Sequence, residues 1–514
     1  MAENEIHPYF PGVNDVVRSL LFKHKFKTLK HNETDNENMY IYIKPEYKFT
    51  LIDGKKVNTN ELWNPDQAGI YIRDESEIKR IIKDEYMNLL NEQLKNAENF
   101  DFEDKEQKEK FLQKLKFKIH RTGIKYSEIK EIMQGIRIET FVDRNEMNPD
   151  EYIPLRSGLL NLNTWQTESF RPDIFFTYKI KGDFNPKIKS LNQIPQFKKL
   201  LLSAFPSYYA VTILDYFAYC YYTAFPMQKV LMMAGIHRRG KGTLVRVLQS
   251  SMPEGFRRIE LEKLLTPDNK FALQNIEGKK VLVDPEISRD NKRRLSFTKV
   301  NSLFGGDTLD MEEKFKIARD ILGKFAGIFI GNVPLFYVND SAFLSRLLIV
   351  VSHPEPTNTD IPDLDKKIWN EEGSLIVSYL LNRLKNLVKR NFKFSNQQTY
   401  EDYAKLWDLL SDSVRIFAEE NYEEDAESSN MEDFVWKHYL LYCEKLGLVP
   451  ENKHNFVHKF GKLYPHKRVR WGEERYYVFS NCAEVVNEPK PDKRQNNVLQ
   501  HSDDKFDPNN ILGL

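Results

Sequence analysis

A glycine-rich segment from Gly235 to Thr243 holds the residues best suited to phosphate chemistry. Gly235 is followed five residues later by Gly240 and then Lys241, which is the spacing of a phosphate-binding loop. Backbone amides of such a loop and the positive end of the next helix converge on phosphate oxygens, and the lysine adds a point charge. The alternative is a glycine turn with a chance lysine. We expect Gly235, Gly240, Lys241, Gly242 and Thr243 to bind a nucleoside triphosphate.

The flanking residues predict a strand before this loop and a helix after it. An apolar run, 230–234, precedes the loop, and apolar residues from Leu244 onward recur at helical spacing. Gly242 stands where a serine or threonine usually offers a hydroxyl to Mg²⁺, and Thr243 follows one residue later. We assign the Mg²⁺ contact to Thr243. A nucleoside-monophosphate kinase is an alternative interpretation of this residue order.

Two carboxylates follow an apolar strand further along the chain. Asp284 and Glu286 flank Pro285 at the end of the run 281–283. A phosphate-transfer ATPase needs one acid near Mg²⁺ and a polar group that orients the attacking water. We assign Asp284 to the metal and Glu286 to the water, with the exchanged roles left open. The alternative is an acidic turn with no part in chemistry.

An amide and an arginine complete the candidate catalytic set. Asn332 follows the apolar run 325–330, where its amide could bond the γ-phosphate or the water, or open a turn before Pro334. Arg346 precedes the apolar run 347–352. It is either a surface residue or an arginine that reaches the nucleotide of a neighbouring subunit and stabilises transition-state charge.

Basic residues near aromatic ones mark two candidate DNA contacts. In the first region, cations would meet phosphates and a ring would stack on bases, and its residues are Lys299, Lys314, Phe315 and Lys316. The second region is a basic cluster near the end of the chain, and its residues are Lys453, Lys459, Lys462, Lys467, Arg468 and Arg470. A solvated loop and a solubilising surface are the respective alternatives.

Length and composition favour a multidomain protein of a reducing compartment. The 514 residues exceed one ordinary domain, the net charge is +1, and three cysteines lack paired spacing. The N-terminus has no secretory pattern, and Asp215 within the apolar run 208–225 favours a buried helix over a membrane span. We therefore expect a cytoplasmic location.

The pattern along the chain predicts further elements. We expect a strand pair at 39–44 and 48–54, helices at 76–94 and 104–117, and a helical block at 196–225. Alternating strands and helices over 226–352 favour a mostly parallel α/β core, and 360–395 closes it with a helix. The composition of the acidic stretch 419–433 predicts an exposed connection. Two helices at 434–446 and 455–463, followed by two strands at 468–479, suggest a winged helix.

The order of these motifs resembles the superfamily 3 helicases, and within them the poxvirus-type primase–helicase and archaeal plasmid replication branch. Gly235–Thr243, Val281–Glu286, Lys299 with Gly305-Gly306-Asp307 and the hairpin Lys314–Lys316 carry the resemblance, together with Gly331–Pro334 and Ser345–Leu347. It implies an α/β fold in which an AAA+-like P-loop ATPase core joins an α+β N-terminal domain and a C-terminal winged helix. The expected parts are an accessory domain at 1–150, a helical domain at 151–225, the ATPase core at 226–395, the winged helix at 411–480 and a disordered tail at 483–514.

The resemblance also implies an activity. It indicates a homo-hexameric ring that hydrolyses ATP with Mg²⁺ at subunit interfaces and moves 3′→5′ on single-stranded and forked DNA, without a membrane. A primase–polymerase is an expected partner or domain of such proteins, although residues 1–150 hold no paired-carboxylate strand pattern of that kind. The rival interpretation is an ATP-dependent initiator that binds and melts an origin without processive unwinding.

Overall fold

The structure is a computed structural model that describes most of the chain. The chain forms two compact units. The described residues are 8–29, 38–52, 55–62, 65–222, 224–267, 269, 271–287, 295–312, 319–332, 335, 338, 340–354, 361–446, 448, 450–471 and 474–485. Unit 1 comprises Met1–Lys179 with Phe315–Arg319, and unit 2 comprises the remainder. The tail expected at 483–514 lies almost entirely outside the described residues.

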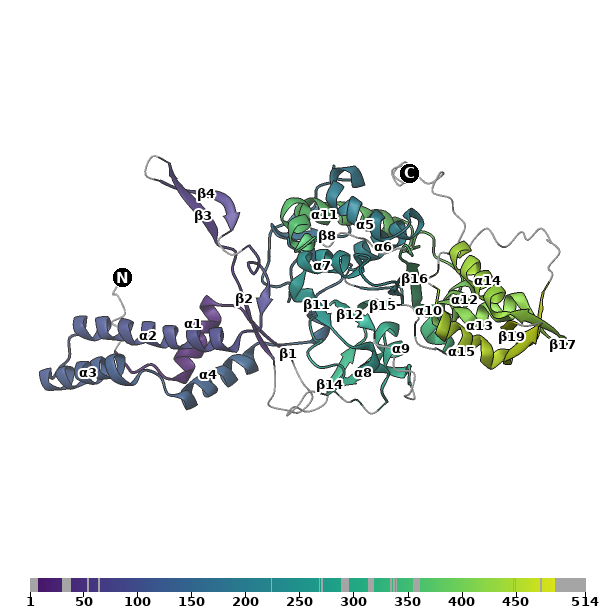
Figure 1. Ribbon diagram of the computed structural model, residues 1–514. Coiled ribbons are helices and arrows are strands. Elements are labelled where there is room, and N and C mark those ends of the chain that lie inside the picture. The colour runs from purple at the N-terminus through teal and green to yellow at the C-terminus, as the bar shows by residue number, and fades with distance from the viewer. Residues whose placement is uncertain are drawn as a thin grey trace. The chain divides into compact units, whose positions relative to one another are not determined.

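Unit 1 combines small sheets with a group of charged helices (Figure 1). One sheet has the order β5-β2-β1-β6, a second is the hairpin β3-β4, and a third has the order β7-β8-β9. The strands are β1 (Phe26–Leu29), β2 (Met39–Tyr42), β3 (Tyr47–Ile52), β4 (Lys55–Leu62), β5 (Tyr71–Ile72), β6 (Phe141–Val142), β7 (Tyr152–Pro154), β8 (Leu159–Asn161) and β9 (Gln166–Glu168). The helices are α1 (Val13–Lys23), α2 (Glu75–Asn99), α3 (Lys105–Phe117) and α4 (Tyr126–Glu139).

The helices of unit 1 bury apolar residues at helical spacing. On α2, Ile78, Ile82 and Leu90 lie in a core that α1, α3 and α4 share, while the opposite face carries lysines and glutamates. The Asp74 side chain accepts a hydrogen bond from the Glu77 amide at 3.0 Å and so defines the start of α2. Both helices expected at 76–94 and 104–117 are confirmed, and α2 extends five residues beyond its expected end.

The strand pairing expected for 39–54 is wrong. β2 pairs with β1 and β5, whereas β3 pairs with β4. All four residues of β2 are buried, so this strand belongs to the interior of the unit and not to an exposed ribbon. The sequence Asp53-Gly54, a frequent hairpin dipeptide, stands between β3 and β4 and was the signal for the observed pairing.

A five-stranded parallel sheet is the centre of unit 2. Its order is β11-β12-β15-β10-β16, with β10 (Val230–Gly235), β11 (Phe256–Arg258), β12 (Val281–Ile287), β15 (Ala326–Asn332) and β16 (Leu347–Val351). Neighbouring strands are parallel throughout. Each of the four strands that the apolar runs predicted is therefore confirmed, and so is their parallel direction. Because β15 separates β10 from β12, the phosphate-loop strand and the acidic strand are not neighbours in the sheet.

Helices pack around this sheet, and one of them contacts the strands β10 and β15 near their first residues. They are α5 (Pro195–Ala204), α6 (Ser207–Tyr219), α7 (Lys241–Ser251), α8 (Leu261–Leu265), α9 (Thr298–Gly305), α10 (Ser341–Arg346) and α11 (Leu364–Lys389). The Tyr216 hydroxyl on α6 lies 2.8 Å from the carbonyl oxygens of both Lys229 and Gly327. Fully buried Asp215 pairs with Arg383 of α11 at 2.8 Å, so α6 is a packed core helix. Among the described residues, no helix is long and apolar enough to cross a membrane.

The C-terminal part of unit 2 is a helical segment with a three-stranded sheet. The elements are α12 (Tyr400–Ser411), α13 (Ser413–Asn421), β17 (Tyr422–Met431), α14 (Glu432–Lys445), α15 (Lys453–Leu463), β18 (His466–Trp471) and β19 (Glu474–Glu484). The sheet order is β17-β19-β18, and all its pairs are antiparallel. The expected helices and strands are present.

The acidic stretch expected as a connection is instead a strand. β17 covers most of 419–433 and pairs with β19, with a register shift between Glu424 and Ser429. Its side chains are mostly exposed, as expected, but its backbone completes the sheet. Composition predicted the exposure correctly and could not show that a distant strand supplies the hydrogen-bonding partner.

Candidate functional site

The segment expected to be a phosphate loop connects β10 to α7 in the predicted strand–loop–helix order. Two of its glycines have backbone angles that favour glycine: φ is +137° at Gly235 and +77° at Gly240. A side chain at Gly235 would also collide with Ser352, so both the backbone angle and the available space require glycine at this position. Gly242 has no such requirement, because it lies within the first turn of α7.

Lys241 is the first residue of α7, and its ammonium group lies inside the loop. Its Nζ donates to the carbonyl oxygens of Gly235, at 3.0 Å, and Ile236, and to Asn332 Oδ1 at 3.3 Å. The residue is only 4% exposed, and burial lowers the pKa of Lys241 to about 8. A triphosphate bound in this loop would meet the amine, and its negative charge would raise the lowered pKa again.

Asn332 reaches this loop because of the sheet register. It ends β15 and stands opposite Gly235 of the neighbouring strand β10. Parallel strands end at the same edge of a sheet, so the amide and the phosphate loop share that edge. The structure thus brings two predicted residues, Lys241 and Asn332, together from positions 91 apart in the sequence.

The two carboxylates on β12 have different environments. Asp284 is buried, and its oxygens accept from the backbone amides of Leu261 at 2.7 Å and Glu286 at 3.1 Å. Burial raises the pKa of Asp284, and those amides oppose the rise. Glu286 is exposed. This contrast favours Asp284 as the group that shapes the strand end and Glu286 as the group open to water.

Substitutions should separate these two roles. We expect Glu286→Gln to lower kcat for ATP hydrolysis by about 10²–10⁴-fold with an unchanged melting temperature, because it removes only a proton acceptor. Asn has one acceptor oxygen, so Asp284→Asn leaves one buried amide without a partner at a cost of about 1–3 kcal/mol and lowers the melting temperature. Hydrolysis rates and thermal melts of both variants test this. A destabilised Glu286→Gln or a fully stable Asp284→Asn contradicts it.

The candidate Mg²⁺ ligands do not contact each other directly. The Thr243 hydroxyl accepts from Arg246 Nη2 at 3.0 Å, and Arg246 Nε also lies 3.2 Å from Asp365 Oδ2. No cluster of three or more metal-ligating side chains occurs in the part of the chain that the structure describes. Mg²⁺ bound with a nucleotide needs only one or two protein oxygens beside phosphates and water, and the Thr243 hydroxyl and the β12 carboxylates are oxygen donors of that chemical kind.

Arg346 lies at the opposite edge of the sheet from the phosphate loop. It ends α10 just before β16, and the next residue stands opposite Val230, the first residue of β10. At about 3.3 Å per residue, the six residues of β10 separate Arg346 from the loop by roughly 17 Å or more. Arg346 therefore cannot reach a nucleotide bound to its own loop.

Lys229, which was not predicted as a functional residue, lies beside Arg346. Its Nζ donates to the Ser345 carbonyl at 2.5 Å, while Arg346 Nη1 donates to the Ala342 carbonyl at 2.7 Å. Burial, and then the charge of Arg346, lowers the pKa of Lys229. The Arg346 Nε is buried without a hydrogen-bond partner among the described residues. The available signal was that Lys229, like Arg346, directly precedes a core strand.

The candidate DNA contacts separate into three groups. Lys299 donates to the carbonyls of Pro267 and Asn269, at 3.2 and 2.8 Å, and so supports a loop. The strands β13 (Thr308–Met311) and β14 (Arg319–Leu322) form the expected hairpin, but Lys314, Phe315 and Lys316 lie outside the described residues. The third group is the C-terminal cluster.

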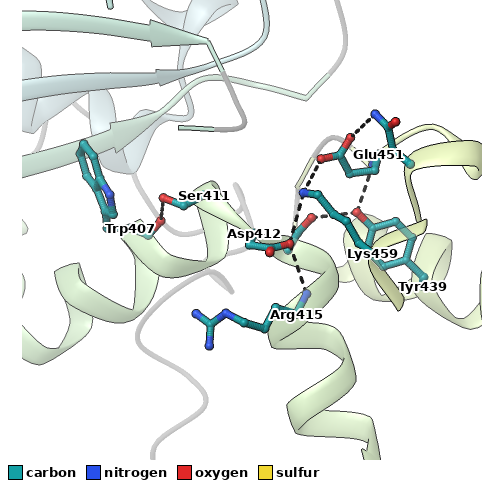
Figure 2. A network of polar contacts seen from close by, with 9 residues as sticks. Trp407, Ser411, Asp412, Arg415, Tyr439, Glu451 and Lys459 are labelled. Carbon is teal, nitrogen blue, oxygen red and sulfur yellow. Dashed lines mark hydrogen bonds and ion pairs between the residues drawn. The ribbon is translucent and has the colours of Figure 1, made fainter. Parts of the chain in front are cut away.

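Within that cluster, two lysines are ion-paired. Lys453 pairs with Glu432 at 3.0 Å and Asp433 at 2.6 Å, and Lys459 pairs with Asp412 and Glu451 (Figure 2). Lys453 is nevertheless exposed, and so are Lys462 on α15 and Lys467, Arg468 and Arg470 on β18. Two exposed histidines, His454 and His458, share the α15 face of Lys462 at spacings of four residues and were not predicted.

Comparisons with known proteins match two segments of the sequence, one before and one after the residues that form the parallel sheet. Residues 30–206 match the family model described as D5 N terminal like, and residues 410–491 match the one described as Poxvirus D5 protein-like. The chain is therefore similar to poxvirus D5-type proteins over both segments. No curated protein matches the sequence.

Solved structures add only a weak likeness. The A-form apo structure of the NrS-1 C terminal region has 12% identity and a TM-score of 0.39, with 92% of this chain and 100% of that chain covered. Another apo structure of that region, residues 305–718, has 12% identity and a TM-score of 0.37, with 91% and 98% covered.

Proposed function

We propose that this protein is an ATP-driven DNA helicase of a viral or plasmid replication system. It works as a homo-hexameric ring that translocates 3′→5′ on single-stranded DNA. The D5-type similarity of the segments 30–206 and 410–491 supports a role in replication. The observation that carries the proposal is the contact between Lys241 and Asn332 at the edge where β10 and β15 end.

In this proposal, each residue at that edge has a defined task. The loop amides and Lys241 bind the β- and γ-phosphates, and Asn332 orients the γ-phosphate or the attacking water. Thr243 and Asp284 hold Mg²⁺ directly or through water, and Glu286 accepts the proton of the water. The strand order supports this arrangement, because β15 brings Asn332 between the loop and the acidic strand.

The proposed ring follows from the position of Arg346 and Lys229. Neither can serve the nucleotide of its own chain, since both lie at the far edge of the sheet. A neighbouring subunit placed with its phosphate loop against that edge would present the γ-phosphate to both cations. Developing negative charge on the phosphate would then be stabilised in trans.

The C-terminal segment supports a second contact with DNA. The order α13-β17-α14-α15-β18-β19, with a sheet arranged β17-β19-β18, supports the assignment of this segment as a winged helix. The exposed face of α15 and the basic residues of β18 would then meet a duplex. This feature favours the second candidate function, an initiator that binds an origin and melts it without processive unwinding.

One experiment tests the proposal and separates the candidates. ATP hydrolysis is measured with and without single-stranded DNA, and strand displacement is measured on forks with a 3′ or a 5′ tail. A helicase gives DNA-stimulated hydrolysis and displacement from the 3′ tail. An initiator gives hydrolysis and duplex binding without displacement. Phosphate transfer from ATP to a nucleoside monophosphate would instead indicate a kinase.

The low pKa of Lys241 predicts a pH dependence of ATP binding. Since burial lowers that pKa to about 8, the amine of the free protein loses its proton above pH 8, and a bound triphosphate must restore it. We expect ATP affinity to fall by up to about tenfold per pH unit above pH 8. Titration calorimetry in buffers of different ionisation enthalpy should detect proton uptake. Lys241→Arg keeps its charge over this range, so an identical fall in that variant contradicts the assignment.

A further inference from the structure

Arg246 of α7 directs its guanidinium group toward the first turn of that helix. Side chains of a helix lean toward its N-terminus, and residues three or four positions apart lie on one face. Arg246 therefore covers the turn that contains Gly242 and Thr243, and its Nη2 donates to the Thr243 hydroxyl at 3.0 Å. Because this turn begins at Lys241, the guanidinium group lies beside the candidate phosphate loop.

Gly242 leaves space for this guanidinium group. A β-carbon at position 242 would lie 3.3 Å from Arg246 Nη1, which is tighter than ordinary van der Waals contact. Phosphate loops usually carry serine or threonine at this position, and its hydroxyl serves the Mg²⁺ ion that bridges the β- and γ-phosphates. In this chain Nη1 of Arg246 thus lies next to the place of that hydroxyl.

Asp365, in the first turn of α11, holds Arg246 in this orientation. Its Oδ2 lies 3.2 Å from Arg246 Nε, and its side chain is only 16% exposed. The contacts with Asp365 and Thr243 use Nε and Nη2, and Nη1 carries two further N–H groups. The Arg246 side chain is 55% exposed, so a ligand in the loop can reach it.

The charge around this turn favours an anionic ligand. Backbone N–H groups and the helix dipole make the N-terminus of a helix attractive to anions and unfavourable for a cation. Asp365 compensates the Arg246 charge only in part, because Arg246 is largely exposed. Phosphate groups would compensate it further, since guanidinium groups bind phosphate oxygens through paired charge-assisted hydrogen bonds.

We propose that Arg246 binds the β- or γ-phosphate of the nucleotide directly, within its own chain. It then supplies part of the positive charge that a Mg²⁺ ion on a loop hydroxyl supplies in the usual arrangement. Asp365 is a positioning residue, because it acts through Arg246. The Thr243 oxygen keeps a second lone pair for Mg²⁺ or its water. The inference rests on the proposed function and deepens it, and it predicts that ATP binds this chain even without Mg²⁺.

Nucleotide titration with and without Mg²⁺ tests the inference on the full chain. ATP affinity is measured by calorimetry in excess EDTA and in excess Mg²⁺. We expect Arg246→Gln to lower ATP affinity about ten- to a hundredfold in EDTA, and by a smaller factor when Mg²⁺ neutralises the same phosphates. Arg246→Lys keeps the charge without the paired donors and should lie between this variant and the parent. Arg80→Gln is the matched control: it removes an exposed arginine of α2 that pairs with Glu77 and Asp84, and it should bind ATP like the parent.

Asp365→Asn separates phosphate binding from a merely structural ion pair. If Arg246 only connected α7 to α11, Arg246→Gln and Asp365→Asn would remove the same bond and change ATP affinity equally. If Arg246 binds phosphate, Asp365→Asn keeps the guanidinium group and loses only a partly exposed ion pair. We therefore expect Asp365→Asn to stay within about fivefold of the parental ATP affinity in EDTA.

The possible outcomes separate this inference from the proposed function. Parent-like ATP affinity of Arg246→Gln in EDTA overturns the inference and leaves the proposed ATPase intact. Equal losses in Arg246→Gln and Asp365→Asn overturn it as well, and so does a parent that binds ATP only in Mg²⁺. If the parent binds ATP in neither condition, the proposed function itself fails.

Discussion

Replacement of Lys241 by alanine should lower kcat for ATP hydrolysis by at least about 10²–10³-fold, the loss expected when one preorganised charged donor is removed. The Nζ of Lys241 lies within the loop and bonds Asn332 Oδ1. ATP affinity should fall as well, because the amine meets the triphosphate in the ground state. Hydrolysis and nucleotide titration together measure both losses.

The stability of Lys241→Ala should change little. Below pH 8 the buried ammonium costs the folded state free energy, since its pKa of about 8 is below that of an exposed lysine. Alanine removes that cost, but it also leaves loop carbonyls without a donor, and the two effects oppose each other. Lys263→Ala is the matched control: it breaks only an exposed pair with Glu260, so hydrolysis should persist. A Lys241→Ala variant that keeps more than about a tenth of parental kcat contradicts the assigned role.

Replacement of Arg346 by alanine should lower kcat by about 10³-fold or more, as the removal of a trans-acting arginine does. ATP affinity should change much less, because the charge that Arg346 stabilises on the neighbouring chain's nucleotide develops mainly in the transition state. Lys229→Ala should give a smaller loss of the same kind, since its ammonium shares that edge. Hydrolysis rates and ATP binding in each variant measure this separation.

A mixing experiment decides whether Arg346 acts between subunits. Neither Lys241→Ala nor Arg346→Ala is active alone, but a site with Lys241 from one chain and Arg346 from its neighbour is complete. Random assembly of equal amounts would create such sites at about a quarter of the interfaces. We therefore expect activity to return on mixing and subunit exchange. If the mixture stays inactive although mixed rings form, a role for Arg346 in trans is wrong.

Local spacing in the sequence determined the elements around the nucleotide site. The apolar run 230–234, the glycines at Gly235 and Gly240, and the apolar helical spacing after Lys241 act within one short stretch, so the strand–loop–helix unit was predictable. The same holds for β12, β15 and β16, whose buried apolar runs are typical of strands in a parallel sheet that is covered on both faces.

Tertiary structure decided every question that depends on which distant residue lies beside a given side chain. Asp284 and Glu286 are equivalent as sequence, and only the burial of Asp284 against the Leu261 amide distinguishes them. Lys459 has the composition of a DNA contact, yet Asp412 and Glu451 neutralise it. The acidic stretch 419–433 was predicted to be an exposed connection, and only its pairing with the distant strand β19 makes most of it the strand β17.

The physical reason is the range of the interactions involved. Propensity, glycine conformation and apolar periodicity depend on neighbours along the chain, so the sequence alone determined the phosphate loop and the core strands. Ion pairing, burial and strand pairing depend on groups brought together by the fold. The contact of Lys241 with Asn332 and the position of Lys229 beside Arg346 at the opposite edge were therefore decided by the tertiary structure alone.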